Sequence, residues 1–353
     1  MARKRPDTCQ RHLQPMPYMW ATCDATEQSL AFAATDKRQW QAWRRKLRRK
    51  FVELLGLHEG EPRCELEPTV NRRRRMDGYR RERVVFQSRP NLSVAAWVLI
   101  PDGLEGPAPT MICLQGHGAG KDDIVGFDDD GKPRAQYGGY QNDFAIQAVR
   151  RGFLVIAPDM FSFGERRDPA DVKQGRRTSS CRMPSMAGML LGRTVPGIRV
   201  YDVMRCIDYL ETRPECDPQR IGCMGISGGG TITTFAAAVE ERIQAALISG
   251  YLAHWRDSIM PMRHCEDNYV PGILQYAEMP DIATLIAPRP VFFENGTEDS
   301  IFPIKSARAA YRKIKAAYKL LGLSERCGMQ VFEGPHEFRG EKGFRFLQKW
   351  LKA

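Results

Sequence analysis

An α/β fold, in which helices cover both faces of a mostly parallel sheet, is predicted by the order of the apolar segments. From residue 110 onward, short runs of mostly apolar residues alternate with longer segments of helical periodicity. Runs such as 153–157 lack the polar alternation of a half-exposed strand, which favours strands buried on both faces. Strands that alternate with helices favour parallel pairing. The 353 residues, 42% of them hydrophobic, suffice for a large core.

The elements follow in order along the chain. A helix is predicted over 35–56, with Thr35 and Asp36 at its start, and two strands follow near 83–87 and 93–101. Further strands are expected at 110–114, 153–159, 221–226, 243–249, 290–295 and 328–333, and helices at 142–151, 196–212, 231–239, 302–321 and 342–352. We therefore divide the chain into an N-terminal helical extension, residues 1–82, and a main domain, residues 83–353.

The helix predicted at 35–56 has one apolar stripe and one basic face. The stripe, at spacings of three and four, is Trp40, Trp43, Leu47, Phe51 and Leu54, and arginines and lysines between 44 and 50 form the other face. A basic amphipathic helix can bind membranes or nucleic acid, but a run of charges more often faces water. With a net charge of +11, the chain could attract acidic partners or simply stay soluble. We expect the stripe to dock on the main domain, without a nucleic-acid or membrane partner.

Cysteine usage and the N-terminal residues bear on the compartment. The ten cysteines are scattered without Cys-x-x-Cys pairs or nearby histidine pairs, so the sequence contains no zinc-binding pattern. The first residues are basic and are followed by no apolar segment of a signal peptide, and no run is long enough to span a membrane. We expect free thiols and a cytoplasmic location.

The strongest functional signal is the sequence Gly-Ile-Ser-Gly-Gly at residues 225–229, which has the pattern Gly-x-Ser-x-Gly. A serine at the tip of a tight strand-to-helix turn has strained backbone angles, and its close neighbours must lack a Cβ. Glycines and serines also occur in flexible loops, but here an apolar run precedes the motif and a small-residue helix follows it. This context predicts that Ser227 is a nucleophile.

A nucleophilic serine needs a histidine to remove its proton and a carboxylate to orient that histidine. In the expected chain order, the acid follows the serine and the histidine comes last. His336, on the loop between the last strand and the last helix, fits this order, whereas His254 and His264 precede the acid. Asp299 and Glu298 both follow the strand at 290–295. We prefer Asp299, because the shorter side chain is the stiffer orienting group.

The negative charge of a tetrahedral intermediate needs two hydrogen-bond donors. The backbone N–H of Gly228, the residue after the nucleophile, is expected to supply one. The other is expected from the loop after the strand at 110–114, where Ala119 or, failing it, Gly118 offers a backbone N–H. His117 of the same loop is expected to be structural, because His336 already serves as the base.

Two long connections, 160–194 and 250–288, follow strands and are expected to form the walls and cap of the pocket, because long loops in compact domains are usually functional. Packed over the nucleophile, their bulky residues would leave a narrow pocket for a short acyl group, although they could equally be core. These residues are Phe161, Phe163, Trp255, Met260, Met262, Tyr269, Tyr276 and Met279.

Together, Ser227, Asp299, His336 and the loop at 117–118 resemble the α/β-hydrolase superfamily over residues 83–353. Several motifs are similar to its dienelactone-hydrolase-like and acetyl xylan esterase-like branch: Gln-Asn-Asp-Phe-Ala at 141–145, Ala-Pro-Asp-Met at 157–160, Phe-Gly-Glu-Arg at 163–166, Cys-Glu-Asp-Asn-Tyr-Val-Pro-Gly at 265–272 and Ile-Ala-Pro-Arg-Pro at 286–290. Dienelactone hydrolases use a cysteine nucleophile, so Ser227 points instead to ester hydrolysis.

The resemblance implies an α/β-hydrolase fold without a metal or an organic cofactor, and assembly into homo-oligomers that the N-terminal helix could serve. We expect a serine carboxylesterase that acts on small-molecule esters with short, acetyl-like acyl groups, and the resemblance suggests acetylated carbohydrates. Two alternatives are a serine peptidase of the prolyl-oligopeptidase-like type and a non-catalytic binding protein on a hydrolase scaffold. We expect no propeller domain of the kind typical of the peptidases, and a complete set of catalytic residues argues against the binding protein.

Overall fold

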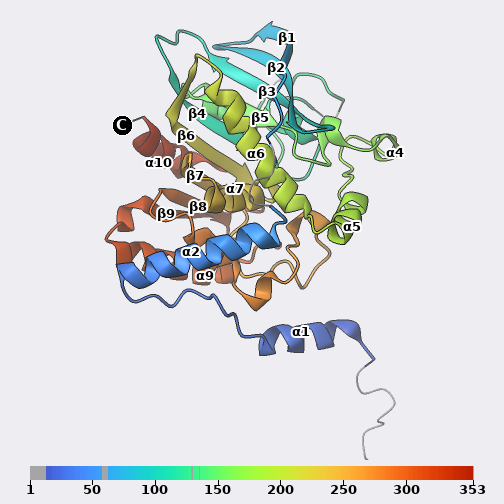
Figure 1. Cartoon of the computed structure of the whole chain (residues 1–353). Helices are drawn as coiled ribbons and strands as arrows, with labels where there is room; N and C mark the ends of the chain where they lie inside the picture. The colour runs from blue at the N-terminus through green and yellow to red at the C-terminus, as the bar shows by residue number, and fades with distance from the viewer. Residues whose placement is uncertain (1–12, 58–62, 129, 135, 353) are drawn as a thin grey trace, which may run out of the picture.

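A computed structural model of the chain describes residues 13–57, 63–128, 130–134 and 136–352. The described residues form one sheet of nine strands in the order β1-β2-β3-β5-β4-β6-β7-β8-β9 (Figure 1). The strands are β1 Thr69–Arg75, β2 Tyr79–Arg89, β3 Leu92–Pro101, β4 Ala108–Leu114, β5 Leu154–Pro158, β6 Cys216–Ile226, β7 Ile243–Ser249, β8 Val291–Gly296 and β9 Cys327–Phe332. All neighbouring pairs from β5 to β9 are parallel, and the pairs from β1 to β5 are antiparallel.

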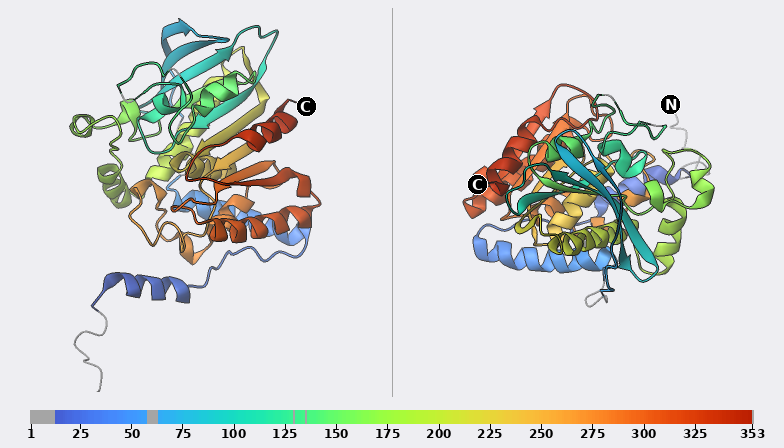
Figure 2. Two further views of the ribbon diagram at one scale, coloured as in Figure 1. Left: turned by 180° about the vertical axis from the view of Figure 1, so that it is seen from behind. Right: turned by 90° about the horizontal axis from the view of Figure 1, so that it is seen from above.

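Helices cover both faces of this sheet, as predicted (Figures 1 and 2). One hydrophobic cluster contains side chains of α2 Lys37–Leu54, α6 Val195–Glu211, α7 Gly228–Val239, α8 Met279–Thr284 and α9 Ile304–Leu321. The second contains side chains of α3 Phe144–Val149 and α10 Glu341–Leu351. Strand residues divide between the clusters by alternation, because successive side chains point to opposite faces. The predicted α/β class is therefore confirmed.

The chain order changes direction at β4, which lies between β5 and β6. In parallel sheets the loops that leave the carboxyl ends of the strands diverge at such a point, and ligands bind there. The loops after β4 and β6 carry His117 and Ser227 respectively. The sheet topology therefore brings two segments more than one hundred residues apart to the same edge.

The N-terminal part contains more structure than the sequence analysis predicted. The predicted boundary between residues 82 and 83 falls inside β2, which pairs with β1 on one side and β3 on the other. We did not predict β1 because its exposed arginines conceal the period of two that marks a strand. We did not predict α1, Pro15–Ala25, either, since it has no stripe of buried residues.

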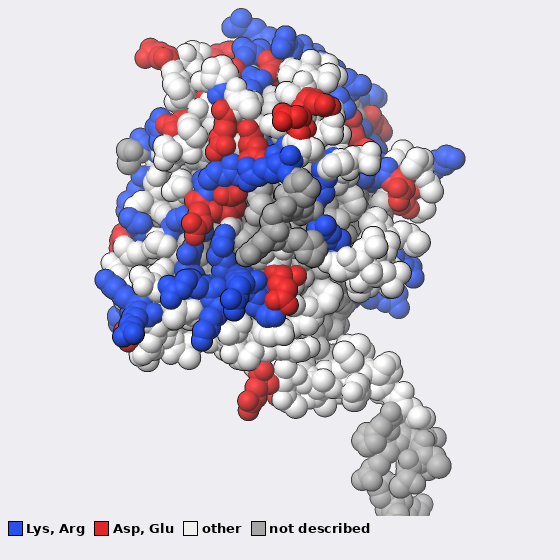
Figure 3. All heavy atoms as spheres, in the orientation of Figure 1, with Lys and Arg blue, Asp and Glu red and all other residues white. Residues whose placement is uncertain are grey.

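Helix α2 docks on the main domain as predicted, and its partner there is the helix that follows Ser227. Trp40, Leu47 and Phe51 are buried, and the ring of Phe51 lies 5.0 Å from that of Phe235 in α7. Lys and Arg side chains gather over α2 on the outer surface (Figure 3). Not all of them face water, since Arg48 donates a hydrogen bond of 2.6 Å to the carbonyl oxygen of Val239.

The two long connections contain short helices. The first includes α4, Pro169–Val172, and α5, Arg182–Leu190, and the second includes α8 and a 3₁₀ turn at Glu266–Asn268. Helix α1 projects from the body and buries no residue (Figures 1 and 2), and Arg256 of the body pairs with its Asp24 at 2.8 Å. Across the part of the chain that the structure describes, no helix combines the length and apolarity needed to cross a bilayer.

The turn between β6 and α7 leaves no room for side chains on its glycines. A Cβ on Gly229 would overlap the carbonyl oxygen of Leu114 at the end of β4, and one on Gly225 would lie 2.5 Å from the carbonyl carbon of Gly229. Real Cβ atoms essentially never approach other atoms so closely. Both glycines of the Gly-x-Ser-x-Gly motif are thus required by contact between β4, β6 and α7.

We predict that Gly229→Ala destabilises the fold by about 3 kcal/mol or more, although alanine is the better helix former by about 1 kcal/mol. Gly106→Ala is the matched control, because a Cβ there meets no atom within 4 Å. Urea unfolding of both variants tests the claim. Equal midpoints would show that the turn relaxes without cost.

Candidate active site

Ser227 lies between β6 and α7 in a strained backbone conformation, with φ 56° and ψ −121°. Its N–H donates to the carbonyl oxygen of Ser249 at the end of β7 at 3.0 Å, and its own carbonyl accepts from Thr231 N–H at 2.8 Å. These bonds hold the turn from both sides. The serine therefore stands at the N-terminus of α7, where the helix dipole favours negative charge.

His336 and Asp299 form a close pair on neighbouring loops. Nδ1 of His336 lies 2.7 Å from Oδ2 of Asp299, whose side chain is only 1% exposed. The other oxygen, Oδ1, accepts backbone N–H bonds from Ile301 and Phe302, each at 2.9 Å. The carboxylate is thus fixed by three donors, and the histidine ring is oriented by its Nδ1. Glu298, the alternative acid, is exposed.

Ser227 and His336 line one cavity of about 350 Å³. Its other lining residues are His117, Tyr140, Met262, Arg263, His264, Cys265, Asn268, Ile301 and Phe302. His336 Nε2 is buried and has no hydrogen-bond partner among the described residues. The ring of His336 stacks between those of Tyr140 at 5.7 Å and Phe302 at 5.8 Å. A fixed histidine thus offers an unoccupied nitrogen at the cavity that holds the serine.

Of the two predicted donors on the loop after β4, Ala119 is engaged elsewhere. Its N–H donates to Oδ2 of Asp123 at 2.8 Å, so it is not free to bind an oxyanion. This bond corrects our first choice for the second donor. Neither Gly118 nor Ala119 lines the cavity, whereas His117 does. The carbonyl oxygen of His117 accepts a hydrogen bond of 2.7 Å from the Tyr140 hydroxyl. The bend of this loop, which sequence alone did not indicate, decides which N–H groups remain available.

Comparison with known proteins agrees with this geometry. The sequence profile of the Abhydrolase family matches residues 4–326, which is most of the chain. The chain belongs to this α/β-hydrolase family. The predicted superfamily and the predicted hydrolase class are therefore confirmed.

Relatives and solved structures show the same relationship. A Bacillus subtilis protein provisionally described as a hydrolase, YtaP, is 27% identical over 267 residues, which is 72% of this chain and 83% of that protein. A Bacteroides fragilis structure, provisionally described as an acetyl xylan esterase, is similar with a TM-score of 0.83 at 19% identity, covering 99% and 97% of the two chains. A glucuronoyl esterase from Solibacter usitatus gives a TM-score of 0.67 at 17% identity, covering 93% and 97%. At such identities the solved structures establish the fold of this hydrolase.

A buried ionic network beneath the cavity was not predicted from the sequence. Asp267 accepts a hydrogen bond of 2.5 Å from Arg199, and the side chains of both are 1% exposed. Asp267 also lies 3.4 Å from Nε2 of His117, whose ring rests against Gly228. Burial opposes ionisation of Asp267, but the neighbouring side chains of His117 and Arg199, with hydrogen bonds from Arg199 and Cys265, lower its pKa. The network anchors the loop after β4 beside the nucleophile. No local sequence motif predicts such a network.

A buried carboxylate also fixes the loop that carries the histidine. Glu294 in β8 accepts backbone N–H bonds from Arg339 at 3.1 Å and Gly340 at 2.9 Å. Burial raises the pKa of Glu294 to about 7. Gly250, at the end of β7, completes the support, because a Cβ there would lie 2.8 Å from Cε1 of His336. The sequence indicated neither contact, since both partners are distant in the chain.

Three of the eight bulky residues that we expected over the nucleophile belong to the core of this hydrolase. Of the bulky side chains that we expected over Ser227, Met262 lines the cavity, whereas Trp255, Met279 and Phe163 are buried. His264 also lines the cavity, and His254 instead lies 3.1 Å from the hydroxyl of Ser306. The apolar wall comes from Met262, Ile301 and Phe302, and the latter two follow the acid rather than forming a cap.

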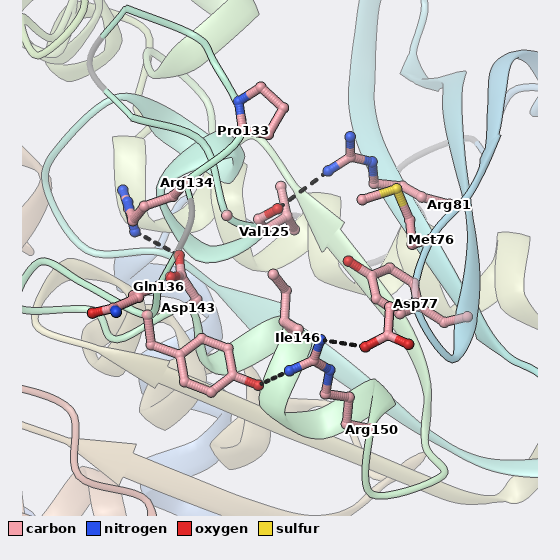
Figure 4. Close-up of a pocket in the computed structure, with 13 residues that line it drawn as sticks. Met76, Asp77, Arg81, Val125, Pro133, Arg134, Gln136, Asp143, Ile146 and Arg150 are labelled. Atoms are coloured by element: carbon pink, nitrogen blue, oxygen red, sulfur yellow. Dashed lines mark hydrogen bonds and ion pairs between the residues drawn. The ribbon is translucent and has the colours of Figure 1, made fainter.

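A second cavity, of about 370 Å³, lies among β2, α3 and the loop after β4, and contains none of the predicted site residues (Figure 4). Its charged side chains are mostly paired: Arg134 bonds Asp143 at 2.6 Å, and Arg150 bonds Asp77 at 3.2 Å. Arg81 donates to the carbonyl oxygen of Val125 at 3.2 Å. These pairs account for the charges that line this cavity, so the Ser227 cavity is the better candidate.

We predict that Asp299→Asn lowers turnover on the order of 10⁴-fold, because an amide cannot orient the same tautomer of His336. Glu298→Gln is the matched control and leaves turnover close to that of the parent, since Glu298 is exposed. Turnover of an aryl acetate by both variants measures the difference. If Glu298→Gln were the more damaging change, the assignment of the acid would be reversed.

Proposed function

We propose that this chain is a serine carboxylesterase that hydrolyses short acyl esters through an acyl-enzyme on Ser227. The observation that carries the proposal is the buried Asp299–His336 pair at 2.7 Å, which leaves Nε2 of His336 unpartnered at the cavity of Ser227. A surface histidine of no catalytic use would not need a carboxylate held by two backbone donors. The proposal rests on this arrangement together with membership of the α/β-hydrolase family.

The reaction follows from the roles that these atoms can take. Nε2 of His336 accepts the hydroxyl proton of Ser227 as the oxygen attacks the ester carbonyl, and Asp299 stabilises the resulting imidazolium. His336 then returns the proton to the departing alcohol, which leaves an acyl group on Ser227. A water molecule, deprotonated by the same nitrogen, attacks the acyl group and releases the acid.

The oxyanion forms at the N-terminus of α7, where the N–H of Gly228 is the first donor. With Ala119 bonded to Asp123, Gly118 is the remaining predicted donor on the loop after β4. The ring of His117 lies against Gly228, with a distance of 3.2 Å from its Cε1 to a Cβ built on that glycine. This contact of the loop with the helix N-terminus motivates the choice of Gly118, although Gly118 itself does not line the cavity.

The cavity supports a short acyl group. Its volume of about 350 Å³ has to hold both the acyl group and the near part of the alcohol. Met262, Ile301 and Phe302 form the apolar part, and histidines and Asn268 form the polar part. Each methylene that fits gains about 0.8 kcal/mol, whereas one that clashes costs more. The rate is thus expected to peak at small acyl groups.

Carbohydrate esters are the substrates that we propose for this site. The similar structures named above are described as acetyl xylan and glucuronoyl esterases, and this similarity motivates the proposal. At the cavity, the partly buried Tyr140 supplies an aromatic ring beside His336, and aromatic faces suit the apolar side of a sugar ring. A sugar alcohol leaving group would therefore fit the polar side of the cavity.

We predict that a fluorophosphonate labels Ser227, and that Ser227→Ala lowers kcat on the order of 10⁴-fold or more while the fold remains intact. His336→Ala has a similar effect, because members of one catalytic unit are not additive. Peptide mass spectrometry locates the label, and circular dichroism checks the fold. Label on another serine, together with normal turnover by Ser227→Ala, would disprove the assignment.

We predict that kcat/KM for p-nitrophenyl esters is highest for acetate to butyrate and falls steeply for octanoate and palmitate. The physical reason is the limited volume beside Met262, Ile301 and Phe302. Release of acetate from acetylated xylo-oligosaccharides and glucose pentaacetate extends the series to sugars. A maximum at octanoate or longer would contradict the proposal of a pocket for short acyl groups. If no acetate is released above the background of Ser227→Ala, carbohydrate esters are not substrates.

A further inference from the structure

Three segments far apart in the sequence place metal-binding side chains together beside the active-site cavity. His117 lies on the loop after β4, Cys181 immediately precedes α5, and Cys265 and Asp267 lie at the 3₁₀ turn Glu266–Asn268. Ligand atoms of His117, Cys265 and Asp267 all lie within 4.8 Å of one another. The thiol of Cys265 hydrogen-bonds to that of Cys181, which adds a fourth side chain to the group.

The spacing fits a small tetrahedral site. Zinc binds sulfur at about 2.3 Å and nitrogen or oxygen at about 2.0–2.2 Å, so ligand atoms around one ion lie roughly 3–4 Å apart. Nε2 of His117 and Oδ2 of Asp267 are 3.4 Å apart. The sulfur of Cys265 lies within 4.8 Å of both atoms, and Cys181 reaches the group through its hydrogen bond with Cys265.

Two features of this group suit it to hold a cation. Nε2 of His117 is a buried atom without a hydrogen-bond partner among the described residues, and it faces Asp267. Asp267 accepts one bond at Oδ2 from Arg199 and one at Oδ1 from Asn268, at 2.5 and 2.8 Å, and a third from the thiol of Cys265. A carboxylate offers about four lone-pair positions, so one position remains for an ion, and the position used by Cys265 becomes free when that thiol loses its proton. The imidazole and the carboxylate can therefore both turn a lone pair toward the same point.

The positive charge of Arg199 offsets part of the negative charge of the proposed ligands and still allows a divalent ion to bind. Its guanidinium bonds Asp267 and also lies 3.2 Å from the sulfur of Cys181. Two thiolates and one carboxylate carry three negative charges, and a divalent ion with the guanidinium carries three positive charges, so the buried group would be neutral. Buried charges are tolerated when they are compensated in this way. Thiolate and imidazole ligands select zinc and similar soft ions over magnesium or calcium.

We propose that Cys181, Cys265, His117 and Asp267 bind one zinc-like divalent cation, which cross-links the three segments beside the cavity. On binding, each thiol loses its proton to solvent and donates a sulfur lone pair to the ion, and no redox step is involved. The sequence analysis found no zinc pattern because these ligands lie up to 150 residues apart rather than in Cys-x-x-Cys pairs. The proposal is independent of the ester reaction, because metal binding is measured without substrate.

The test is a Co²⁺ titration of the full chain, stripped with a chelator and kept under a non-coordinating reductant. We expect one Co²⁺ per chain, a thiolate-to-metal charge-transfer band in the near ultraviolet, and loss of the band when Zn²⁺ is added. Cys181→Ser and Cys265→Ser each reduce the band, and His117→Gln weakens binding at least tenfold. Cys64→Ser is the matched control and keeps the band, because this partly exposed thiol lies outside the group.

A measurement on the unaltered chain removes any dependence on variant folding. In ¹¹³Cd nuclear magnetic resonance, one signal in the range of two-thiolate sites is expected from the wild-type protein. A signal typical of oxygen ligands alone, or no charge-transfer band with Co²⁺, would overturn the proposal. So would a band that is unchanged in a Cys181→Ser, Cys265→Ser double variant with native circular dichroism.

Discussion

The close contact between the end of β4 and the start of α7 is the constraint on which the site depends. Gly229 allows the helix to approach so near that a single methyl group would overlap the carbonyl oxygen of Leu114. Beside this contact Ser227 has a positive φ of 56°, and the helix N-terminus lies at the end of β4. The strain at one residue is maintained because three surrounding elements leave the turn no other conformation.

The other groups are brought to this point by strand ends and are fixed by buried carboxylates. Asp299 orients the ring of His336, Glu294 holds the following loop through its backbone, and Asp267 ties His117 to Arg199. Each acid is enclosed and satisfied by named donors, so each can fix a position with little freedom. The positions of the groups around the cavity thus result from buried polar bonds as much as from apolar packing.

Sequence reasoning reached the features that depend on local pattern. Apolar runs indicated the parallel strands, and chain order placed Ser227, Asp299 and His336 on loops that the structure brings together. It failed where a contact between distant segments determines the role of a residue. Ala119 was chosen as an oxyanion donor without knowledge of its bond to Asp123, and Trp255 was assigned to a cap although it belongs to the core. The strand β1 was missed because its arginines lie on an exposed edge. The ion pair of Arg199 and Asp267 was missed because no sequence periodicity marks a buried ion pair.

Helix α1 adds length to the molecule without adding core. Within it, Asp24 pairs with Arg256 at 2.8 Å, and beyond it, backbone bonds from Ser29 to Gln275 and from Leu30 to Tyr276 join the chain to the body. The heat capacity change of unfolding scales with apolar surface that becomes exposed, so this helix contributes almost nothing to it. Its projection from the body does increase the frictional drag on the molecule. Sedimentation would therefore register this segment clearly, whereas calorimetry would scarcely register it.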